Sequence, residues 1–594
     1  MPKSSSSAGS DGSIVLPGLG LPLDVYQAAD SNIRKFANAL GHAWDAEVSF
    51  IPLREFTMMR LMNEMTDKIA WEEKIMNPEI AARWREEALN TPDTDITQAM
   101  VNWCMAEVQY KAEMLKKTNA VVVFTGDVVK SDTIVPDSVR LALVDAVKPL
   151  EDIPERMKDW HPRSNGTVLD LVHPSLFPVV YERTRALSYG GTTLEDCIAL
   201  SGAGETLGTP EFLEDSEYES ETGDVDIHEP FSSKFQWLPC EVDFSNGQTK
   251  ITSYINNLHP HHHKHLYQLI EQIIGYAVPL WDITLTPQRK GYEHRIDYGS
   301  CEYEPKAPPD EEDRDEYWRK WEEWVEVREV ILPDPGIFVP LPSFDDLDLK
   351  TNSEGRVRLR EEFGKEGIQV IVKLANILLT PENPEYGGGT WHVEGQLNEH
   401  ICASAIHYYS SSNITTSRLS FRQRVHHSYD DMNIGHGQDE KEWLSAVFGC
   451  EDETGEPIQD IGSVETREGR LITFPNHLQH KVEAFRLEDP TQPGYRKILA
   501  LFLVDPQTRI LSSRNIPCQR LDWWAEAIGN AGAKDTALDP FSRLPAEVQG
   551  QIFDKVEDFP ISLDEAKILR LELMDERSIF GETQRVIKIA AYSP

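Results

Sequence analysis

The N-terminal part of the chain alternates apolar and polar residues with the period of a helix. Leu, Met, Trp and Val recur every three or four positions, as in PLREFTMMRLMNEMTDKI (52–69) and TQAMVNWCMAEVQYKAEMLKK (97–117). This spacing gathers apolar side chains on one helical face. A β-rich run, NAVVVFTGDVVKSDTIVP (119–136), interrupts the pattern before it resumes. We expect an N-terminal helical region over 14–80 and a mostly helical domain over 81–335.

The pattern changes beyond residue 335. Short β-branched runs such as GIQVIVKLANILLT (367–380), GRLITFP (469–475) and RKILALFLVDP (496–506) are separated by Gly, Pro, Asn and Asp. No long helical segment alternates with them, so an antiparallel sandwich or jelly-roll barrel over 336–512 is favoured over a doubly wound parallel sheet. Helical spacing returns over 513–594. The expected fold class is α+β.

Charge narrows the range of partners. The 594 residues carry a formal net charge of −41. A phosphate backbone or an anionic lipid surface would be repelled, so we expect neither nucleic acid nor membrane as a partner. The acidic stretch 211–229 contains no Lys or Arg and predicts a solvated loop. The polar residues 1–13 predict a disordered tail.

Cysteine use and the lack of long apolar runs indicate the compartment. The seven cysteines show no CxxC spacing, which is typical of free thiols in a reducing compartment. The start of the chain lacks the apolar stretch of a signal peptide. The run ILALFLV is far shorter than the roughly 20 residues that span a bilayer. We expect a cytoplasmic protein, with the nucleus as the alternative; the oligomeric state is left open.

The segment TWHVEG contains the first candidate metal ligands. On a β-strand, side chains two positions apart point to the same face, so His392 and Glu394 would project together. Two such ligands chelate one ion without backbone strain. Most His-x-Glu pairs are ordinary surface or core pairs, so a metal site needs a third ligand.

The run FPNHLQHKVEAF supplies that ligand. Leu478, His480 and Val482 would share one face of a strand, whereas His477 belongs to the preceding turn. We select His480. Two imidazoles and one carboxylate form the facial triad that suits non-haem Fe(II) and leaves positions open for a 2-oxoacid and O2.

A chelating 2-oxoglutarate needs a cation for its distal carboxylate. Arg496 opens the strand RKILALFLVDP, which would return alongside the metal strand and present a bidentate guanidinium, while Lys497 would face the opposite side. On the strand that precedes the metal motif, Lys373 and Asn376 face opposite sides. We select Asn376 as the second residue that contacts the cosubstrate.

The tract HPHHHKH (259–265) is another place where metal could bind. Apolar residues at helical spacing follow it directly in LYQLIEQIIGYAVPLW (266–281). We interpret the tract as a turn that leads into a helix.

Several segments carry a family resemblance. The order His-x-Glu, a β-rich stretch, a second His and then Arg on the next strand resembles the iron(II)/2-oxoglutarate-dependent oxygenases, which are built on a double-stranded β-helix. DWHPRSNGTVLDLVHPSLFPVVYERTR, SYINNLHP, TWHVEGQLNEHI and LALFLVDP resemble a fungal family of uncharacterised domains, DUF4246-like, over roughly residues 20 to 580. Oxygenases of this class more often have Asp in the position of Glu394, whose longer side chain still reaches iron.

The resemblance implies a dioxygenase. His392, Glu394 and His480 would hold Fe(II), and 2-oxoglutarate would bind with its far carboxylate on Arg496. Reaction with O2 would yield succinate, CO2 and an oxidised product, by default a hydroxylated carbon of an unidentified small-molecule or protein substrate. Two alternatives stay open: a catalytically inactive β-helix that serves as a binding scaffold, and a cupin-like metalloenzyme that does not use 2-oxoglutarate.

Overall fold

The structure is a computed structural model of the whole chain. It describes residues 14–23, 36–37, 40, 48, 50–212, 230–290, 292, 294–309, 312–340, 356–425, 434–435, 442–450, 458–532, 544–545, 547–548, 551, 555 and 559–590. The expected tail 1–13 and all but the first two residues of the acidic stretch 211–229 lie outside these ranges.

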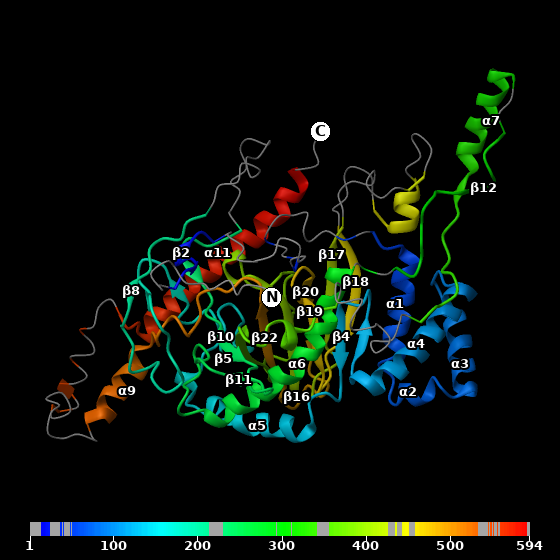
Figure 1. The fold of residues 1–594 in the computed structure, drawn as a ribbon. Coiled ribbons are helices and arrows are strands. Elements are labelled where there is room, and N and C mark those ends of the chain that lie inside the picture. Colours follow the sequence, from blue (N-terminus) through cyan, green and yellow to red (C-terminus); the bar gives the residue numbers. More distant parts are fainter. Residues whose placement is uncertain are drawn as a thin grey trace.

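A nine-stranded antiparallel sheet forms the centre of the molecule (Figure 1). Its order is β11-β10-β14-β22-β16-β19-β4-β3, and β5 pairs with β14 beside β10. The strands are β3 (Val121–Val123), β4 (Val128–Ser131), β5 (Val168–Val172), β10 (Cys240–Asp243), β11 (Lys250–Ile251), β14 (Ile368–Leu379), β16 (Ile401–Ser412), β19 (Leu471–Pro475) and β22 (Gly494–Val504).

A second, smaller sheet faces the first. It consists of β18 (Ile458–Glu465), β17 (Arg418–Arg424) and β20 (Gln479–Val482), all antiparallel. β15 (Glu385–Tyr386) and β21 (Phe485–Arg486) form a separate antiparallel pair. β21 follows β20 directly in the sequence.

Successive side chains of β22 point to opposite faces of the large sheet and belong to two separate cores. Ala500 and Phe502 belong to a buried cluster with Leu419 and Phe421 of β17, so these residues fill the space between the two sheets. Leu499, Leu501 and Leu503 point to the other face, where they pack with the apolar side chains of the helices that cover the sheet. Because β22 is covered on both faces, it appears in the sequence as a continuous apolar run rather than an alternating one.

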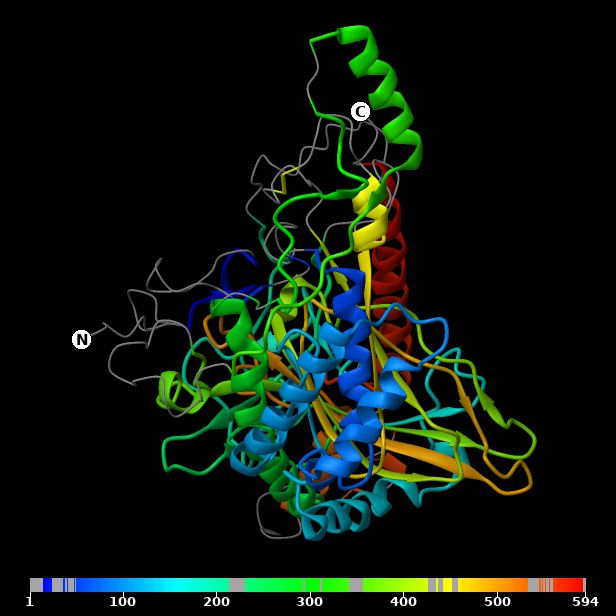
Figure 2. The same cartoon turned by 90° about the vertical axis from the view of Figure 1, so that its right-hand side faces the viewer.

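Helices cover the outer face of the large sheet and flank it. α5 (Asp137–Glu151) and α6 (Lys264–Lys290) pack on β16, and α6 also packs on β19 (Figure 2). The other helices are α1 (Leu53–Met65), α2 (Trp71–Lys74), α3 (Pro78–Leu89), α4 (Gln98–Thr118), α7 (Arg314–Val327), α8 (Leu359–Glu362), α9 (Leu521–Gly532) and α11 (Leu563–Ala590). α7 extends away from the body (Figures 1 and 2).

The mixed helix and strand content confirms the broad fold class, but the region 81–335 is less helical than expected. Five of the nine strands of the large sheet, β3, β4, β5, β10 and β11, come from this region. Each has only two to five residues, as in VVV and VVKS. Strands this short are difficult to recognise in a sequence whose neighbouring segments have helical periodicity. No helix in the described part of the chain is both long and apolar enough to cross a membrane.

A buried ion network anchors the N-terminal helices. Arg295 donates to Glu55 Oε1 of α1 at 3.2 Å and to Glu107 Oε1 of α4 at 2.7 Å. Its side chain is 10% exposed and that of Glu55 is fully buried. Removal of the guanidinium would leave a buried carboxylate without its cation, which is much more costly than the loss of a surface pair.

We therefore expect Arg295→Met to lower the free energy of unfolding by about 3–5 kcal/mol. Urea denaturation of the full chain measures this change. The matched control is Arg319→Met, which removes an exposed pair with Glu323 and is expected to cost less than about 1 kcal/mol. Equal effects of the two substitutions would contradict a supporting role for the buried network.

Candidate metal centre

Backbone pairing brings together the two histidines selected from the sequence. His392 N donates to His480 O at 3.2 Å, and His480 N donates to His392 O at 2.9 Å. Residues that exchange both hydrogen bonds in an antiparallel pair point their side chains to the same side. His480 also pairs with buried Phe421 of β17, so both imidazoles project toward the space between the sheets.

The expected strand through Glu394 is shorter than predicted. Only His392 forms a bridge, and the chain bends at Glu394 and Gly395, where Gly395 has φ +73°. Upstream, Gly388 has φ +89°, and a Cβ there would lie 3.0 Å from Val482 O. The glycine run therefore permits the close approach of this segment to β20.

Three potential ligand atoms converge at this point. Glu394 Oε1 lies 3.4 Å from His480 Nε2 and 3.7 Å from His392 Nε2, and the two imidazole centroids are 4.4 Å apart. The His480 side chain is 3% exposed, that of Glu394 14% and that of His392 46%. The site is thus buried on the His480 side and open on the His392 side.

The hydrogen bonds of His392 determine which ring nitrogen is free. Its Nδ1 lies 2.8 Å from Thr390 O, and a carbonyl only accepts, so Nδ1 carries the proton. Nε2 of the neutral ring therefore presents a lone pair toward the Glu394 carboxylate. Two electron-pair donors that face each other need a cation between them. A proton would satisfy one contact, whereas a divalent metal ion would satisfy all three, so the donor set fits a transition metal.

Local charge holds Glu394 and His480 in their metal-binding forms. Burial alone would raise the pKa of Glu394, but the two imidazoles hold it well below its usual value. Burial, aided by the neighbouring His392, lowers the pKa of His480 and favours its neutral ring. Although burial opposes its charge, Glu394 raises the pKa of His392, so a metal ion would displace a proton from that ring. A carboxylate and neutral imidazoles are the states that coordinate a metal ion.

Asn476 positions Glu394 and was not identified from the sequence. Its Oδ1 accepts from Glu394 N at 2.9 Å, and its Nδ2 donates to Glu394 O at 2.9 Å and to Ile401 O at 3.1 Å. The side chain amide thus replaces the strand partner that Glu394 lacks. The only hint in the sequence is an Asn directly before HLQH, where it looks like an ordinary turn residue.

Arg496 lies on the face of β22 that points between the sheets. It is 2% exposed and its Nη1 donates to Ser417 Oγ at 2.7 Å. Its guanidinium lies over the rings of Tyr408 and Phe485, at 5.4 and 5.1 Å from their centroids. Burial lowers its pKa. Within the described part of the chain, no carboxylate forms an ion pair with it.

Strand β17 links Arg496 to the metal ligands. Phe421, which pairs with His480, and Leu419 are both in the core between the sheets, and Ser417 has the same parity. Ser417 and Phe421 are about 13 Å apart at the roughly 3.3 Å rise per residue of a strand. The arginine and the histidine thus project from neighbouring elements into one interior space.

Asn376 is not brought to this site, and its selection over Lys373 is corrected. Asn376 lies on the outer face of β14, where Nδ2 donates to Glu151 Oε1 of α5 at 2.7 Å. Lys497 donates to the same carboxylate at 2.7 Å, on the outer face as expected. Lys373 pairs with core residue Ala500 and has the inner parity. Both faces of β14 are apolar, so the residue pattern does not indicate which face is interior.

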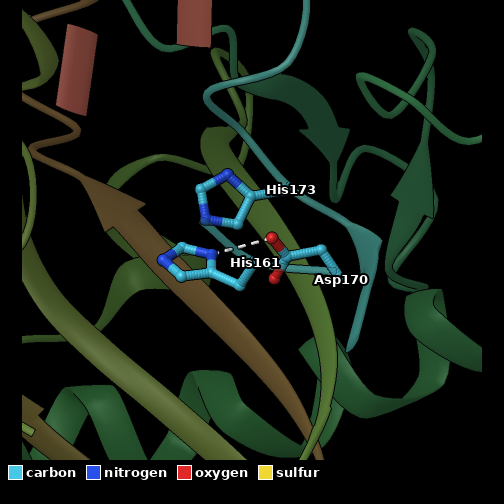
Figure 3. Close-up of side chains that lie close together, drawn as sticks. All are labelled: His161, Asp170 and His173. Atoms are coloured by element: carbon cyan, nitrogen blue, oxygen red, sulfur yellow. Dashed lines mark hydrogen bonds and ion pairs between the residues drawn. The ribbon is translucent and has the colours of Figure 1, made fainter. Parts of the chain in front are cut away.

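Two other groups of histidines and a carboxylate occur among the described residues, and their hydrogen bonds differ. In the first, drawn in Figure 3, His161 Nδ1 lies 2.8 Å from Asp170 Oδ2, and His173 Nδ1 accepts from Ser175 N. In the second, His259 Nδ1 accepts from the backbone of His261 and His262, and Glu526 completes the group.

An imidazole that accepts at Nδ1 carries its proton on Nε2 and has no lone pair to give a metal ion there. His173 and His259 are both of this kind. The tract 259–265 is a turn that leads into α6, which begins at Lys264, as the sequence predicted.

The remaining histidines near the motifs have other partners. His477 Nε2 lies 3.2 Å from Tyr292 Oη, His400 donates to Leu23 O, and His407 Nδ1 donates to Arg470 O. His426 and His427 lie outside the described residues. The choice of His480 over His477 is thus consistent with the geometry.

Comparison with known families identifies relatives by sequence. A profile described as "Protein of unknown function (DUF4246)" matches residues 98–527, and a profile for the N-terminal domain of DUF4246, also of unknown function, matches residues 16–87. No curated protein matches the chain significantly.

Solved structures resemble only a small part of the chain. IDO from Bacillus thuringiensis shares 12% identity over 23% of this chain and 45% of its own, with a TM-score of 0.14. The Fe(II)/(alpha)ketoglutarate-dependent dioxygenase TqaL shares 14% over 23% and 43%, also at 0.14. EvdO2 from Micromonospora carbonacea var. aurantiaca, complexed with 2-oxoglutarate, shares 12% over 23% and 52%, at 0.12. The chain spans about half the length of these structures, and similarity this weak carries no argument.

The Asn476 contacts generate a test of the centre. Because the amide fixes the Glu394 backbone, we expect Asn476→Ala to weaken binding of Co(II), a spectroscopic substitute for Fe(II), by about 10- to 100-fold. Anaerobic titration monitored by the d–d absorption of Co(II) measures the affinity.

Asn102→Ala is the control, because Asn102 is exposed on α4 and bonds only to Gln98 in the described structure. It is expected to leave Co(II) affinity unchanged. Unchanged affinity in Asn476→Ala, with the fold intact, would show that Asn476 does not position a metal ligand.

Proposed function

The chain belongs to the DUF4246 family, and from this premise we propose that it is an iron(II)/2-oxoglutarate-dependent oxygenase whose two facing sheets form a double-stranded β-helix. Two antiparallel sheets with an apolar core between them, and with helices outside the larger one, support this assignment of the core. The family has no established reaction, so the proposal depends on the site.

His392, Glu394 and His480 would hold the iron. They would supply two imidazole nitrogens and one carboxylate oxygen, a ligand set that leaves further coordination positions for small ligands. When bound there with 2-oxoglutarate and O2, ferrous iron supplies the oxidising power that hydroxylates an otherwise unreactive carbon. Thr390 orients His392 through its carbonyl, and Asn476 holds Glu394.

The buried guanidinium of Arg496 is the observation that carries the 2-oxoglutarate assignment. An ion moved out of water costs several kcal/mol unless an opposite charge compensates it. The described residues around Arg496 offer hydroxyls and aromatic rings but no carboxylate. An incoming dicarboxylate would supply the missing charge, and the planar guanidinium would bind it through two parallel hydrogen bonds.

Neighbouring side chains prepare Arg496 for this role. Ser417 Oγ accepts from Nη1, and Thr466 Oγ1 lies 2.5 Å from Ser417 Oγ. Tyr408 and Phe485 exclude water from the guanidinium, which strengthens its interaction with an anion. Arg496 Nε, buried and without a hydrogen-bond partner in the described structure, remains as a further donor.

The buried guanidinium weighs against a cupin-like metalloenzyme, and the converged ligand atoms weigh against an inactive scaffold. A cupin-like metalloenzyme without a 2-oxoacid has no use for an arginine held in the interior without a counter-charge. An inactive scaffold has no need to keep three ligand atoms converged beside a carboxylate of lowered pKa. The exposed edge of His392 would admit a substrate, either a small molecule or a protein side chain.

The proposal predicts a large and selective effect at Arg496. In Arg496→Met, 2-oxoglutarate would lose its charged partner while the apolar side chain fills the same space. We expect the affinity of the Fe(II)-loaded protein for 2-oxoglutarate to fall at least about 30-fold. Anaerobic isothermal titration calorimetry measures this change.

Lys497→Met is the matched control, because it removes an adjacent positive charge from the outer face of the same strand. It should leave 2-oxoglutarate affinity within about twofold of the wild type. If Arg496→Met and Lys497→Met bind 2-oxoglutarate equally well, the 2-oxoglutarate assignment is wrong.

A further inference from the structure

A second cavity is built by elements other than those that carry the residues proposed for iron. It encloses about 390 Å³ between the end of α5, strand β5, the turn before α6 and the starts of α9 and α11. The family-like segments DWHPRSNGTVLDLVHP and SYINNLHP contribute to its wall, and the proposed oxygenase centre uses neither.

Asp170 presents a fixed negative oxygen in this cavity. Its side chain is 1% exposed. Oδ2 lies 2.8 Å from His161 Nδ1 and 3.5 Å from Arg570 Nη1, whereas Oδ1 is buried without a hydrogen-bond partner in the described structure. Figure 3 shows the carboxylate beside both imidazoles. Although burial opposes ionisation, interactions with His173 and His161 and with the cation of Lys373 lower the pKa of Asp170 to about 2, so it is ionised at neutral pH.

Asn257 presents a second oxygen with a fixed orientation. Its Nδ2 donates to His173 O at 2.8 Å and to Leu176 O at 2.6 Å. Because carbonyl oxygens only accept, the amide cannot be flipped, and Oδ1 is left buried without a partner in the described part of the chain. Asn257 is 9% exposed and lines the same cavity as Asp170.

The other charges in the wall are largely compensated. Arg520 contacts Asp522 through two hydrogen bonds of 3.0 and 2.6 Å, and Lys567 lies 3.8 Å from Asp159. Glu526 adds an acidic group. Leu150, Ile153, Leu169 and other apolar side chains complete the wall.

We propose that this cavity binds a small organic ligand through a protonated primary amine, which donates hydrogen bonds to Asp170 Oδ1 and Asn257 Oδ1. Both oxygens accept only, so an anion would be repelled and a neutral acceptor would gain nothing. The apolar wall accommodates the carbon chain of the ligand.

A metal ion fits this place less well than an ammonium group. His161 carries a proton on Nδ1, which lies 2.8 Å from Asp170 Oδ2. His173 carries its proton on Nε2 because its Nδ1 accepts from Ser175 N. Neither of these two protonated nitrogens offers a lone pair to a metal ion. An ammonium group needs only acceptors, which Asp170 and Asn257 provide.

The test compares probes of equal length in the full-length protein. Titration calorimetry with n-butylamine, 1,4-diaminobutane, 1-butanol and butyrate separates the charge from the carbon chain. We expect at least one amine to bind at least about tenfold more tightly than 1-butanol, and butyrate not to bind. Equal binding of amines and 1-butanol, or no binding of either amine, would overturn the proposal.

Variants locate the site. Asp170→Asn should weaken amine binding by at least about tenfold. Since Asp170 also contacts Arg570, Glu526→Gln provides a second variant at the exposed rim, where a smaller loss of affinity is expected without an effect on folding. Asp564→Asn, an exposed change of the same charge outside the cavity wall, should have no effect. Zn(II) binding that is lost in His173→Gln, without amine binding, would show a metal site instead.

Discussion

The exchange of two backbone hydrogen bonds between His392 and His480 is the constraint on which the candidate centre depends. It places two imidazoles side by side from segments that are far apart in the sequence. Once they are paired, Glu394 follows two residues later, at a bend that Asn476 holds in place. Nitrogen atoms from two rings and a carboxylate oxygen then converge, and together they form a donor set that a metal ion would complete. The metal affinity would thus be determined by the backbone geometry.

The alternation of side chains along β22 places two adjacent cationic residues in different environments. Arg496 and Lys497 are adjacent, yet one points between the sheets and the other pairs with Glu151 on the helix-covered face. The outer cation has its carboxylate within the chain, whereas the inner one has none among the described residues. This difference distinguishes an ion pair that supports the fold from a buried charge that the proposed 2-oxoglutarate would compensate. Similar reasoning leads to the cavity at Asp170 and Asn257, where one oxygen of each side chain has no hydrogen-bond partner among the described residues.

Much of this arrangement follows from the sequence. The β-rich texture past residue 335, the candidate ligands His392 and His480, and the opposite directions of Arg496 and Lys497 follow from period-two alternation and spacing. Glu394 reaches the same point from a bend and not from the strand that was expected. Three features do not follow from these patterns. The strands of residues 121–251 are too short to show a period, Asn376 lies on a strand with two apolar faces, and the contact of Asn476 with Glu394 joins remote segments. Each depends on tertiary packing that local patterns do not contain.

The central claim is that His392, Glu394 and His480 hold an iron that 2-oxoglutarate chelates. The most direct test is the visible absorption spectrum of the anaerobic protein with Fe(II) as 2-oxoglutarate is added. The account predicts a weak charge-transfer band in the wild type that saturates at one 2-oxoglutarate per chain and is absent in His480→Ala. An iron-loaded wild type without such a band, or a band that persists in His480→Ala, would contradict it.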